Sequence, residues 1–440
     1  MSTYALDRSQ LNSLLAMDHI DPQVREAIID YLQDDGLLIG PHSTVKVQEN
    51  GYPPTLDPAA QVLIVDSSPV TVGTDPNLKV IIDIADATIN VTGSQSVFVA
   101  TGPGNDKVDL TGSSGNDVVM TGAGNDTVLG GSGADSIYGG TGNDQLHAGS
   151  GNHQLISGSA GNDTVWGGSG DCDTIYGGTG NDVIYGGSGN HTLIQSFGGN
   201  DTIWGGSGNY DTISGGHGND VIHGGSGDHD LIQSFGGNDT IYAGSGNYDT
   251  IIGSSGNDVI YGGSGNHDLI LAGNGNDTIY GGSGNYDTIT GSNGNDVIHG
   301  GSGNYESIQG GNGNDTIWAG SGNYDTIGGG NGNDVLYGGS GNHQLLQGNG
   351  GNDKFYAGTG GDTLQGSSGN DTFYIGLQGN DTIDGGGGGQ DIVQFSDSSK
   401  NAHISSHNGV TTVTFSDTGQ SMKITNVEEL VFSDHHTTKL

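Results

Sequence analysis

The sequence is poor in positive charge. Its 440 residues include 9 Lys and Arg against 50 Asp and Glu, the formal net charge is -41, and only 31% of the residues are apolar. A chain of this charge and hydropathy stays unfolded unless its acids are neutralised. Because Lys and Arg are so scarce, we expect bound metal cations to supply the charge, and we expect no nucleic-acid partner.

Cysteine pairs, long apolar runs and catalytic motifs are also lacking. Cys172 is the single cysteine and has no partner for an internal disulfide. No apolar run approaches the ~18 residues of a membrane span, so we expect none. The start, MSTYALDRSQ, does not resemble a cleavable signal peptide. There is no HExxH zinc motif and no nucleophile serine in a GxSxG turn, and about 100 residues before the repeat leave little room for a catalytic domain, so we expect no enzyme.

Glycine, by contrast, is abundant and periodic. The 89 glycines do not follow a Gly-X-Y triplet, which excludes collagen. Instead, segments such as DTIYGGSGNYDTI, from Asp277, and DVIYGGSGNHDLI, from Asp258, recur every 19 residues within a stricter unit of 38. A nonapeptide and a decapeptide alternate, so we expect one coil per 19 residues. A fixed period of this kind predicts a solenoid, here an all-β parallel β-roll or β-helix of about 15 coils.

The nonapeptide GGxGNDxUx, in which U is Ile, Leu or Val, has the chemistry of a cation-binding turn. Glycine allows backbone dihedrals that aim carbonyl oxygens at one centre. The Asp adds an anionic oxygen, and xUx forms a short strand with U pointing inward. Hard oxygen ligands without sulfur favour several Ca²⁺ ions over Mg²⁺ or transition metals.

These tandem repeats, from Gly104 to about Asp391, resemble the RTX or hemolysin-type calcium-binding repeat. The resemblance implies a parallel β-roll with calcium held between the turns of adjacent coils. It also implies secretion, because the closing ITNVEELVFSD is similar to the carboxy-terminal region of proteins exported by type I secretion, a route that fits the missing signal peptide. Carried over by position, the ligand acids are Asp117, Asp126, Asp135, Asp144, Asp163, Asp182, Asp201, Asp220, Asp239, Asp258, Asp277, Asp296, Asp315, Asp334, Asp353, Asp362 and Asp371.

The decapeptide departs from this pattern by one residue inserted before the acid. The insertion predicts an altered turn, which makes Asp173, Asp211, Asp249, Asp287 and Asp325 doubtful ligands. The inserted residues lie 19 apart, so they should stack at about 4.8 Å per coil. We therefore predict one calcium edge and one edge closed by side-chain stacking and Asn/Ser ladders. The inserted residues are His153, Cys172, His191, Tyr210, His229, Tyr248, His267, Tyr286, Tyr305, Tyr324 and His343.

A second aromatic column follows the inward residue of the nonapeptide strand and should face outward on one flat side. Stacking that merely stabilises the sheet is one interpretation. The other is a contact surface for a second copy of the chain, a cell-surface glycan or a solid. Across the two columns, the stacking or contact residues that we single out are Trp166, Tyr185, Trp204, Tyr242, Tyr261, Tyr280, Trp318, Tyr337, Tyr210, Tyr248, Tyr286 and Tyr324. Histidines two coils apart are too distant to share one metal ion.

Four regions are expected. Residues 1–40 form a short helical segment, with Leu11 and Leu15 on one helix face and Ile28 and Leu32 on another. Residues 41–103 form a turn-rich connector and an apolar β-solenoid cap. Residues 104–391 form the calcium-binding roll, and 392–440 form a small β cap and secretion region that ends in a flexible tail.

Three functions fit this sequence. The first is a secreted, calcium-folded structural rod that assembles with itself into a surface layer, matrix fibre or filament. The second is a glycan- or ice-binding adhesion module, although Thr240 and Thr278 alternate with Val259, which weakens a regular ice-matching array. The third is an accessory calcium-binding module of a secreted enzyme.

Overall fold

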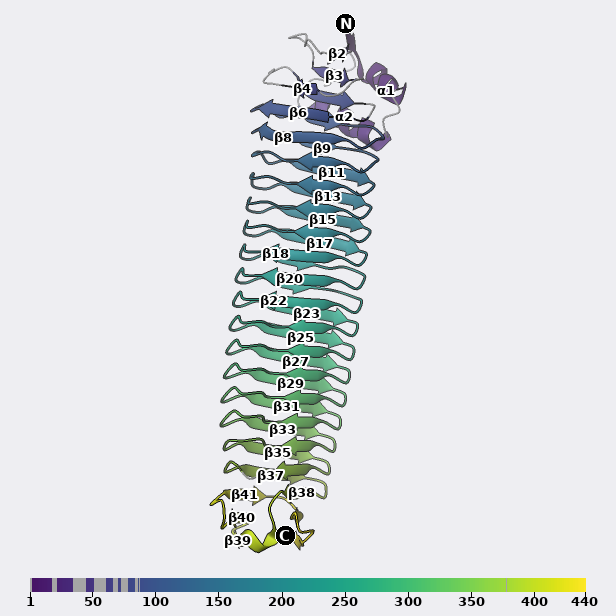
Figure 1. The fold of residues 1–440 in the computed structure, drawn as a ribbon. Coiled ribbons are helices and arrows are strands. Elements are labelled where there is room, and N and C mark those ends of the chain that lie inside the picture. Colours follow the sequence, from purple (N-terminus) through teal and green to yellow (C-terminus); the bar gives the residue numbers. More distant parts are fainter. Residues whose placement is uncertain are drawn as a thin grey trace. The chain divides into compact units, whose positions relative to one another are not determined.

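The computed structural model describes residues 2–17, 22–34, 45–50, 61–65, 70–72, 78–83, 86, 88–376 and 378–440. The chain divides into two compact units, Met1–Val221 and Ile222–Leu440. Each unit is a parallel β-solenoid (Figure 1), and the described residues make about 17 turns and two helices. The all-β solenoid fold is therefore confirmed. The number of turns exceeds the expected 15 because glycine-poor coils precede the repeat.

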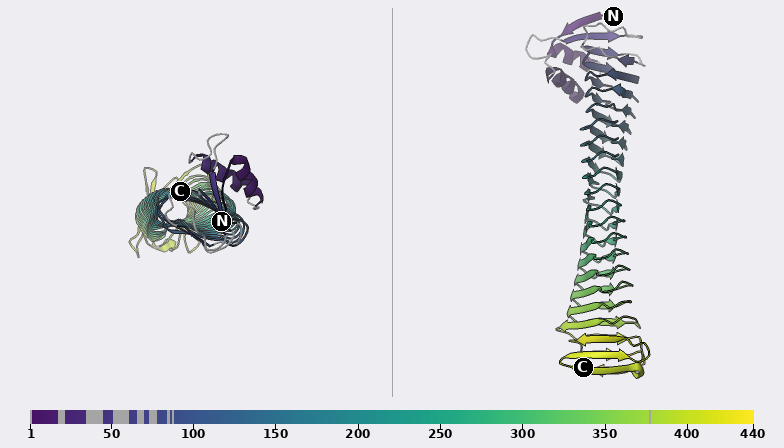
Figure 2. Two further views of the ribbon diagram at one scale, coloured as in Figure 1. Left: turned by 90° about the horizontal axis from the view of Figure 1, so that it is seen from above. Right: turned by 90° about the vertical axis from the view of Figure 1, so that its left-hand side faces the viewer.

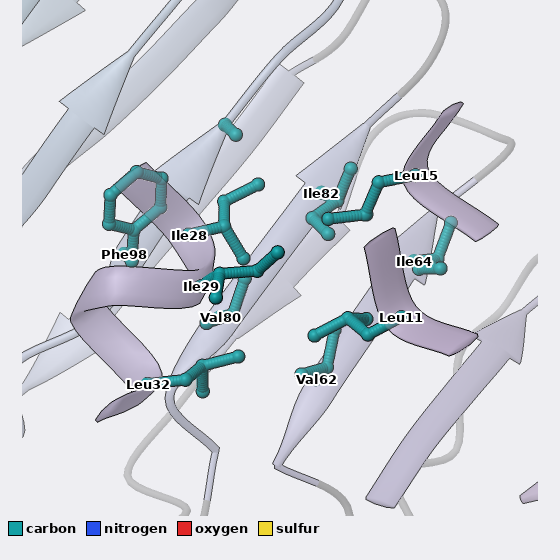
Figure 3. Packing of buried hydrophobic residues seen from close by; sticks show 11 residues of the cluster. Leu11, Leu15, Ile28, Ile29, Leu32, Val62, Ile64, Val80, Ile82 and Phe98 are labelled. Carbon is teal, nitrogen blue, oxygen red and sulfur yellow. The ribbon is translucent and has the colours of Figure 1, made fainter. Parts of the chain in front are cut away.

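The first unit begins with a helical layer packed on a sheet. Helices α1 (Arg8–Met17) and α2 (Pro22–Asp34) carry apolar side chains on one face each, as expected. Asp7 and Gln10 cap α1 reciprocally, because each side chain accepts the backbone N–H of the other residue. The buried faces cover the first strands of the solenoid (Figure 3), in a cluster that includes Leu11, Leu15, Ile28, Leu32, Val62, Val80 and Phe98. Neither helix has the length and apolar composition that a membrane crossing requires.

Two sheets run through the first unit, one on each side of every coil. We name them after the turn that precedes their strands in the repeat. The decapeptide sheet contains β2 (Val45–Asn50), β3 (Val62–Val65), β5 (Val80–Asp83), β7 (Phe98–Ala100), β9 (Val118–Met120), β11 (Ser136–Thr141), β13 (Leu155–Ala160), β15 (Thr174–Thr179), β17 (Leu193–Gly198) and β19 (Thr212–Ser214), with β1 (Ser2–Leu6) antiparallel to β2. The nonapeptide sheet contains β4 (Val70–Val72), β6 (Thr88–Gly93), β8 (Lys107–Ser113), β10 (Thr127–Leu129), β12 (Gln145–His147), β14 (Thr164–Trp166), β16 (Val183–Tyr185) and β18 (Thr202–Gly206).

The second unit repeats this arrangement. Its decapeptide sheet contains β21 (Leu231–Gln233), β23 (Thr250–Ser255), β25 (Leu269–Asn274), β27 (Thr288–Asn293), β29 (Ser307–Asn312), β31 (Thr326–Asn331), β33 (Leu345–Gly350), β35 (Thr363–Ser368), β37 (Thr382–Gly387) and β41 (Ser421–Thr425). Its nonapeptide sheet contains β20 (Val221–Gly225), β22 (Thr240–Gly244), β24 (Val259–Tyr261), β26 (Thr278–Tyr280), β28 (Val297–His299), β30 (Thr316–Trp318), β32 (Val335–Tyr337), β34 (Lys354–Tyr356), β36 (Thr372–Ile375), β38 (Ile392–Phe395) and β42 (Glu429–Val431).

Strand register shows that 19 residues form one coil in the central repeats. Thr164 pairs with Val183, and Leu269 pairs with Thr288. Figure 2 shows the strands of each unit from two further sides. The middle residue of a strand, such as Ile175 or Ile184, is fully buried between the two sheets, while its neighbours point outward. The core is therefore thin, with about one apolar side chain per strand, and the turns must contribute much of the stability.

Both ends of the chain contain strands that the sequence did not predict. Strand β1 lies within the expected helical segment and β2 within the expected connector, while residues 41–44 and 51–58 of that connector lie outside the described residues. At the other end, the small β cap contains the antiparallel strands β39 (Ala402–His407) and β40 (Val410–Phe415) together with β41, after the short 3-10 helix η1 (Ser399–Asn401). The prediction of a flexible tail is wrong, because β43 (Thr437–Lys439) pairs with β42.

Candidate metal-binding turns and aromatic stacks

The acids before the strands form two buried rows. The nonapeptide row contains Asp126, Asp144, Asp163, Asp182, Asp201 and Asp220 in the first unit and Asp239, Asp258, Asp277, Asp296, Asp315, Asp334, Asp353 and Asp371 in the second. The decapeptide row contains Asp117, Asp135, Asp173 and Asp211 in the first unit and Asp230, Asp249, Asp268, Asp287, Glu306, Asp325, Asp362 and Asp381 in the second. The predicted ligands Asp117, Asp135 and Asp362 thus belong to the decapeptide row, and the other predicted ligands form the nonapeptide row.

One oxygen of most Asp carboxylates in these rows is occupied by the backbone, whereas neither carboxylate oxygen of Glu306 has a hydrogen-bond partner. The Oδ1 atom accepts the N–H of the residue at the same position one coil earlier. In the nonapeptide row, Asp182 Oδ1 accepts from Asp163 N at 2.8 Å. In the decapeptide row, Asp287 Oδ1 accepts from Asp268 N at 3.0 Å. This repeated bond fixes each carboxylate inside its turn and links neighbouring coils.

The second carboxylate oxygen points at main-chain oxygens. Asp296 Oδ2 and Asp315 Oδ2 are buried and have no hydrogen-bond partner. A Cβ added to Gly291 would lie within 3.0 Å of both Asp296 Oδ2 and Gly310 O. A Cβ added to Gly310 would likewise lie within 3.0 Å of both Asp315 Oδ2 and Gly329 O. Glycine therefore leaves a cradle lined by a carboxylate oxygen and a carbonyl oxygen of the next coil. Both are acceptors, so only a proton or a cation can satisfy them.

Burial raises the pKa of these acids, so their charged form is unfavourable when no cation is bound. Burial, with a smaller contribution from neighbouring acids, raises the pKa of Asp163 and of Asp296 to about 7. In the decapeptide row burial raises the pKa of Asp173 to about 6. Burial beside Asp325 and Asp287 raises the pKa of Glu306 to about 9. Both rows thus hold carboxylates that lack compensating positive charge.

Calcium fits this donor set. Among the described residues, no three His, Cys, Asp or Glu side chains converge as one metal-ligand group. Most half-coils offer one carboxylate instead, so a bound ion would take most of its ligands from main-chain carbonyl oxygens. Such hard and irregularly placed oxygens suit Ca²⁺ better than the strict octahedron of Mg²⁺ or the softer preferences of transition metals. The ligand roles of the individual acids stay predictions.

The inserted residue of the decapeptide does not displace the acid that follows it. Cys172, His191, Tyr248 and the other inserted residues adopt left-handed backbone conformations, with φ between 58° and 64°. Their side chains leave the turn outward, and the following acid keeps its buried position. The decapeptide acids are therefore as buried as the nonapeptide acids, and the question of which of them bind calcium stays a prediction.

The column on the nonapeptide sheet is a continuous ring stack within each unit. In the first unit it contains His147, Trp166, Tyr185 and Trp204, with centroid separations of 4.0 to 5.8 Å. In the second unit the separations are 4.5 to 5.1 Å and the rings are within 10° of parallel, for His223, Tyr242, Tyr261, Tyr280, His299, Trp318, Tyr337, Tyr356 and Tyr374. Most of these residues are partly buried, so the stack is part of the sheet surface.

The inserted residues form the turn stack, which is more exposed. In the second unit it contains His229, Tyr248, His267, Tyr286, Tyr305, Tyr324 and His343, with separations of 4.9 to 5.2 Å. Tyr248 and Tyr286 expose 52% and 51% of their surface. An amide ladder runs beside the rings, in which Asn266 Nδ2 donates to Asn247 Oδ1 at 2.9 Å. In the first unit, His191 stacks on Tyr210 at 5.2 Å.

Sequence reasoning missed two exposed phenylalanines. Phe197 and Phe235 expose 50% and 46% of their surface and have φ of about 70°. They occupy a turn position that glycine, such as Gly178, takes elsewhere. The signal was present in the sequence, because QSFGGND replaces the usual small residues there. Phe197 also contacts Tyr176, with ring centroids 5.4 Å apart.

The match to a family model agrees with the calcium-binding repeat inferred above. The sequence profile described as "RTX calcium-binding nonapeptide repeat (4 copies)" matches a series of segments from 98–128 to 373–389. No curated protein sequence matches the chain. Among solved structures, a hyperactive, Ca²⁺-dependent, β-helical antifreeze protein from an Antarctic bacterium is 18% identical, with 75% of this chain and 84% of that chain covered and a TM-score of 0.32. The periplasmic alginate epimerase AlgG is 10% identical, with 90% and 92% covered and a TM-score of 0.14. TM-scores this low do not bear on function.

Proposed function

Since the chain belongs to the family of RTX calcium-binding nonapeptide repeat proteins, we propose that it is a secreted structural protein whose solenoid folds when calcium fills its turns. One observation carries this proposal: buried carboxylate oxygens without a hydrogen-bond partner, such as Asp296 Oδ2 and Asp315 Oδ2, lie beside glycine carbonyl oxygens. Calcium supplies the positive charge that these acceptors lack. Because the sites do not exist in an unfolded chain, binding energy becomes folding energy.

The regions have separate roles in this proposal. Residues 104–391 bind calcium, while 1–103 and 392–440 protect the first and last coils. We propose export by a type I route and folding outside the cell, where calcium is abundant. The protein is structural rather than catalytic, because the chemical groups repeated along the chain are ligands for folding ions and stacked rings.

Circular dichroism with and without a chelator tests calcium-dependent folding. At pH 7.5 we expect the β-sheet signal to disappear when calcium is removed and to return when calcium, but not an equal concentration of magnesium, is added back. A spectrum that does not respond to the chelator would contradict the proposal.

We further propose that the turn stack is a contact surface for a second copy of the chain. Its tyrosines, such as Tyr286 and Tyr324, are about half exposed and are held in place by their neighbours. Rings that are already ordered lose little entropy on contact, and aromatic residues are enriched in interface cores. Rings at the same position on successive coils let two copies pair along several coils.

Sedimentation velocity in calcium tests this association. We expect oligomers of the native chain and mainly monomers of a Tyr286→Ser/Tyr324→Ser variant. Tyr261→Ser, in the less exposed sheet stack, is the matched control and should leave the oligomers intact. A native chain that stays monomeric at high concentration would contradict self-association. Retention of that monomer on a glycan array would support the adhesion alternative.

A further inference from the structure

Three positions in the decapeptide row have no acid, and their side chains donate hydrogen bonds to glycine. Gln154 and Gln344 replace Asp with an amide, and Thr192 replaces it with a hydroxyl. Gln154 Nε2 donates to Gly151 O at 2.9 Å, and Gln344 Nε2 donates to Gly322 O at 2.9 Å. Thr192 Oγ1 donates to Gly189 O at 3.2 Å. Each donor reaches the carbonyl oxygen of the third glycine of the motif, which lies in the same turn for Gln154 and Thr192 and one coil earlier for Gln344.

Three successive cradles in the second unit show what this donor replaces. The point that a Cβ on Gly341 would occupy lies within 3.0 Å of both Gly322 O and Gln344 Nε2. At Gly322, one coil earlier, the corresponding atoms are a carbonyl oxygen, Gly303 O, and the carboxylate oxygen Asp325 Oδ2. The amide nitrogen of Gln344 therefore stands where a carboxylate oxygen stands in the preceding coil.

The same comparison extends one coil further, to a glutamate. At Gly303 the two atoms are Gly284 O and Glu306 Oε1. Gln and Glu have the same length and differ only in one terminal atom. A donor meets a carbonyl oxygen in the Gln344 turn, whereas two acceptors meet in the Glu306 turn.

The acidic turns of this row also contain unpaired buried oxygens. Asp173 Oδ2, Asp325 Oδ2 and both carboxylate oxygens of Glu306 are buried without a hydrogen-bond partner. The three side chains are at most 2% exposed. A buried acceptor left unpaired costs roughly 1–3 kcal/mol, and more if it is charged, so these turns require a proton or a cation.

We propose that the decapeptide turns form a second row of calcium sites at Asp173, Glu306 and Asp325, and that at Gln154, Thr192 and Gln344 a side-chain donor takes the place of the ion. The two amides still have one unpaired buried oxygen each, Gln154 Oε1 and Gln344 Oε1. This proposal rests on the calcium-dependent folding proposed above and assigns ions to the edge that carries the turn stack. The inserted residue has a left-handed backbone and an outward side chain. It therefore accommodates the extra length of the decapeptide without changing the cradle. Both edges then bind calcium, and they differ in their outer surfaces and in the three turns of the decapeptide edge that hold no ion.

Native mass spectrometry of the full chain in calcium tests this assignment. Glu306→Gln preserves length, and Asp325→Gln reproduces the side chain found at Gln344. We expect each variant to bind one calcium ion fewer than the native chain. Gln344→Asp should bind one ion more. Asp315→Asn, in the nonapeptide row, is the matched control and should also lose one ion, with circular dichroism verifying that each variant is folded.

The outcomes separate this proposal from the one it rests on. If Asp315→Asn loses an ion while Glu306→Gln and Asp325→Gln keep the native count, the second row does not exist and calcium-dependent folding stands. If the native chain binds no calcium and folds without it, the proposed function fails. If Gln344→Asp does not fold, the isosteric Glu306→Gln variant still decides the question.

Discussion

The nonapeptide turn before Asp315 and the decapeptide turn before Asp325 differ by one residue, yet both place a carboxylate in the same kind of buried cradle. Asp315 Oδ1 accepts the N–H of Asp296, and Asp325 Oδ1 accepts the N–H of Glu306, at 2.8 and 3.0 Å. The difference appears outside the coil, where Tyr324 adopts φ of 63°. An insertion thus changed the outer surface while the inner chemistry stayed the same.

This comparison explains why the extra residue is a large aromatic one. A left-handed backbone costs a residue other than glycine roughly 1–2 kcal/mol. Tyr324 stacks on Tyr305 and His343, with ring centroids 5.2 and 5.1 Å apart. Aromatic pairs contribute about 0.5–1.5 kcal/mol each. The stack therefore offsets the strain, and glycine, although free of strain, would have no ring to stack.

If the buried acids of the two rows behave alike, folding should depend on pH, and this is the largest effect that we expect. Without a cation, burial raises the pKa of Asp163 to about 7 and that of Asp173 to about 6, against about 3.9 in an unfolded chain. The folded chain then binds more protons than the unfolded chain between about pH 4 and pH 7. Its stability is present at acid pH and is lost as the pH rises through 6 to 7.

In chelator we expect the β-sheet signal at pH 4.5 and its loss by pH 7.5. With calcium the chain should fold at pH 7.5, and lowering the pH from 8 to 6 should lower the calcium concentration needed for half folding, because protons can satisfy the same buried acids in the folded chain. Circular dichroism at a series of pH values measures both. A signal in chelator that is independent of pH would show that these acids are not protonated in the folded chain.

A smaller effect should follow when a glycine of either turn is replaced. In the nonapeptide turn, Gly313 has φ of 139° and a Cβ there would collide with Gly294 O. In the decapeptide turn, a Cβ on Gly322 would meet Gly303 O and Asp325 Oδ2, but φ is ordinary. We expect Gly313→Ala to lower the free energy of unfolding by about 2–4 kcal/mol and Gly322→Ala by about 1–3 kcal/mol, since only the first adds strain to crowding.

Urea unfolding in saturating calcium measures both costs. Gly387→Ala is the control, because no atom lies within 4 Å of its Cβ position and it should change stability little. Equal losses for Gly313→Ala and Gly322→Ala would show that crowding between coils, and not the dihedral angle, sets the cost in both turns.

The sequence predicted the periodic features well because spacing alone determines them. The 19-residue separation of Asp163 and Asp182 predicted the pairing of Thr164 with Val183, and the same spacing predicted the ring stack of Tyr261 on Tyr280. It did not predict where the decapeptide places its acid. A Tyr or His with positive φ is rare, so no local signal showed that the insertion would turn outward.

The ends of the chain were predicted less well because their strands form by pairing with other segments. Strand β43, Thr437–Lys439, has no apolar alternation, but its backbone pairs with Glu429–Val431. Similarly, β1 lies within a segment expected to be helical and pairs with β2. The closure of neutral turns by Gln344 and Gln154 was also beyond sequence reasoning, because it depends on where a carbonyl oxygen of another or the same coil lies.

The smallest expected effect separates strain from stacking at one inserted residue. Tyr286 has φ of 63° and stacks on His267 and Tyr305, with both ring centroids 5.0 Å away. Tyr286→Ala keeps the backbone strain and loses both stacks, whereas Tyr286→Gly loses the stacks and relieves the strain. We therefore expect Tyr286→Gly to be more stable than Tyr286→Ala by roughly 1 kcal/mol and close to the native chain. Urea unfolding of the three proteins in calcium measures the order. If the Tyr286→Ala variant is as stable as the Tyr286→Gly variant, the left-handed backbone of this residue carries no strain, and stacking has no strain to offset.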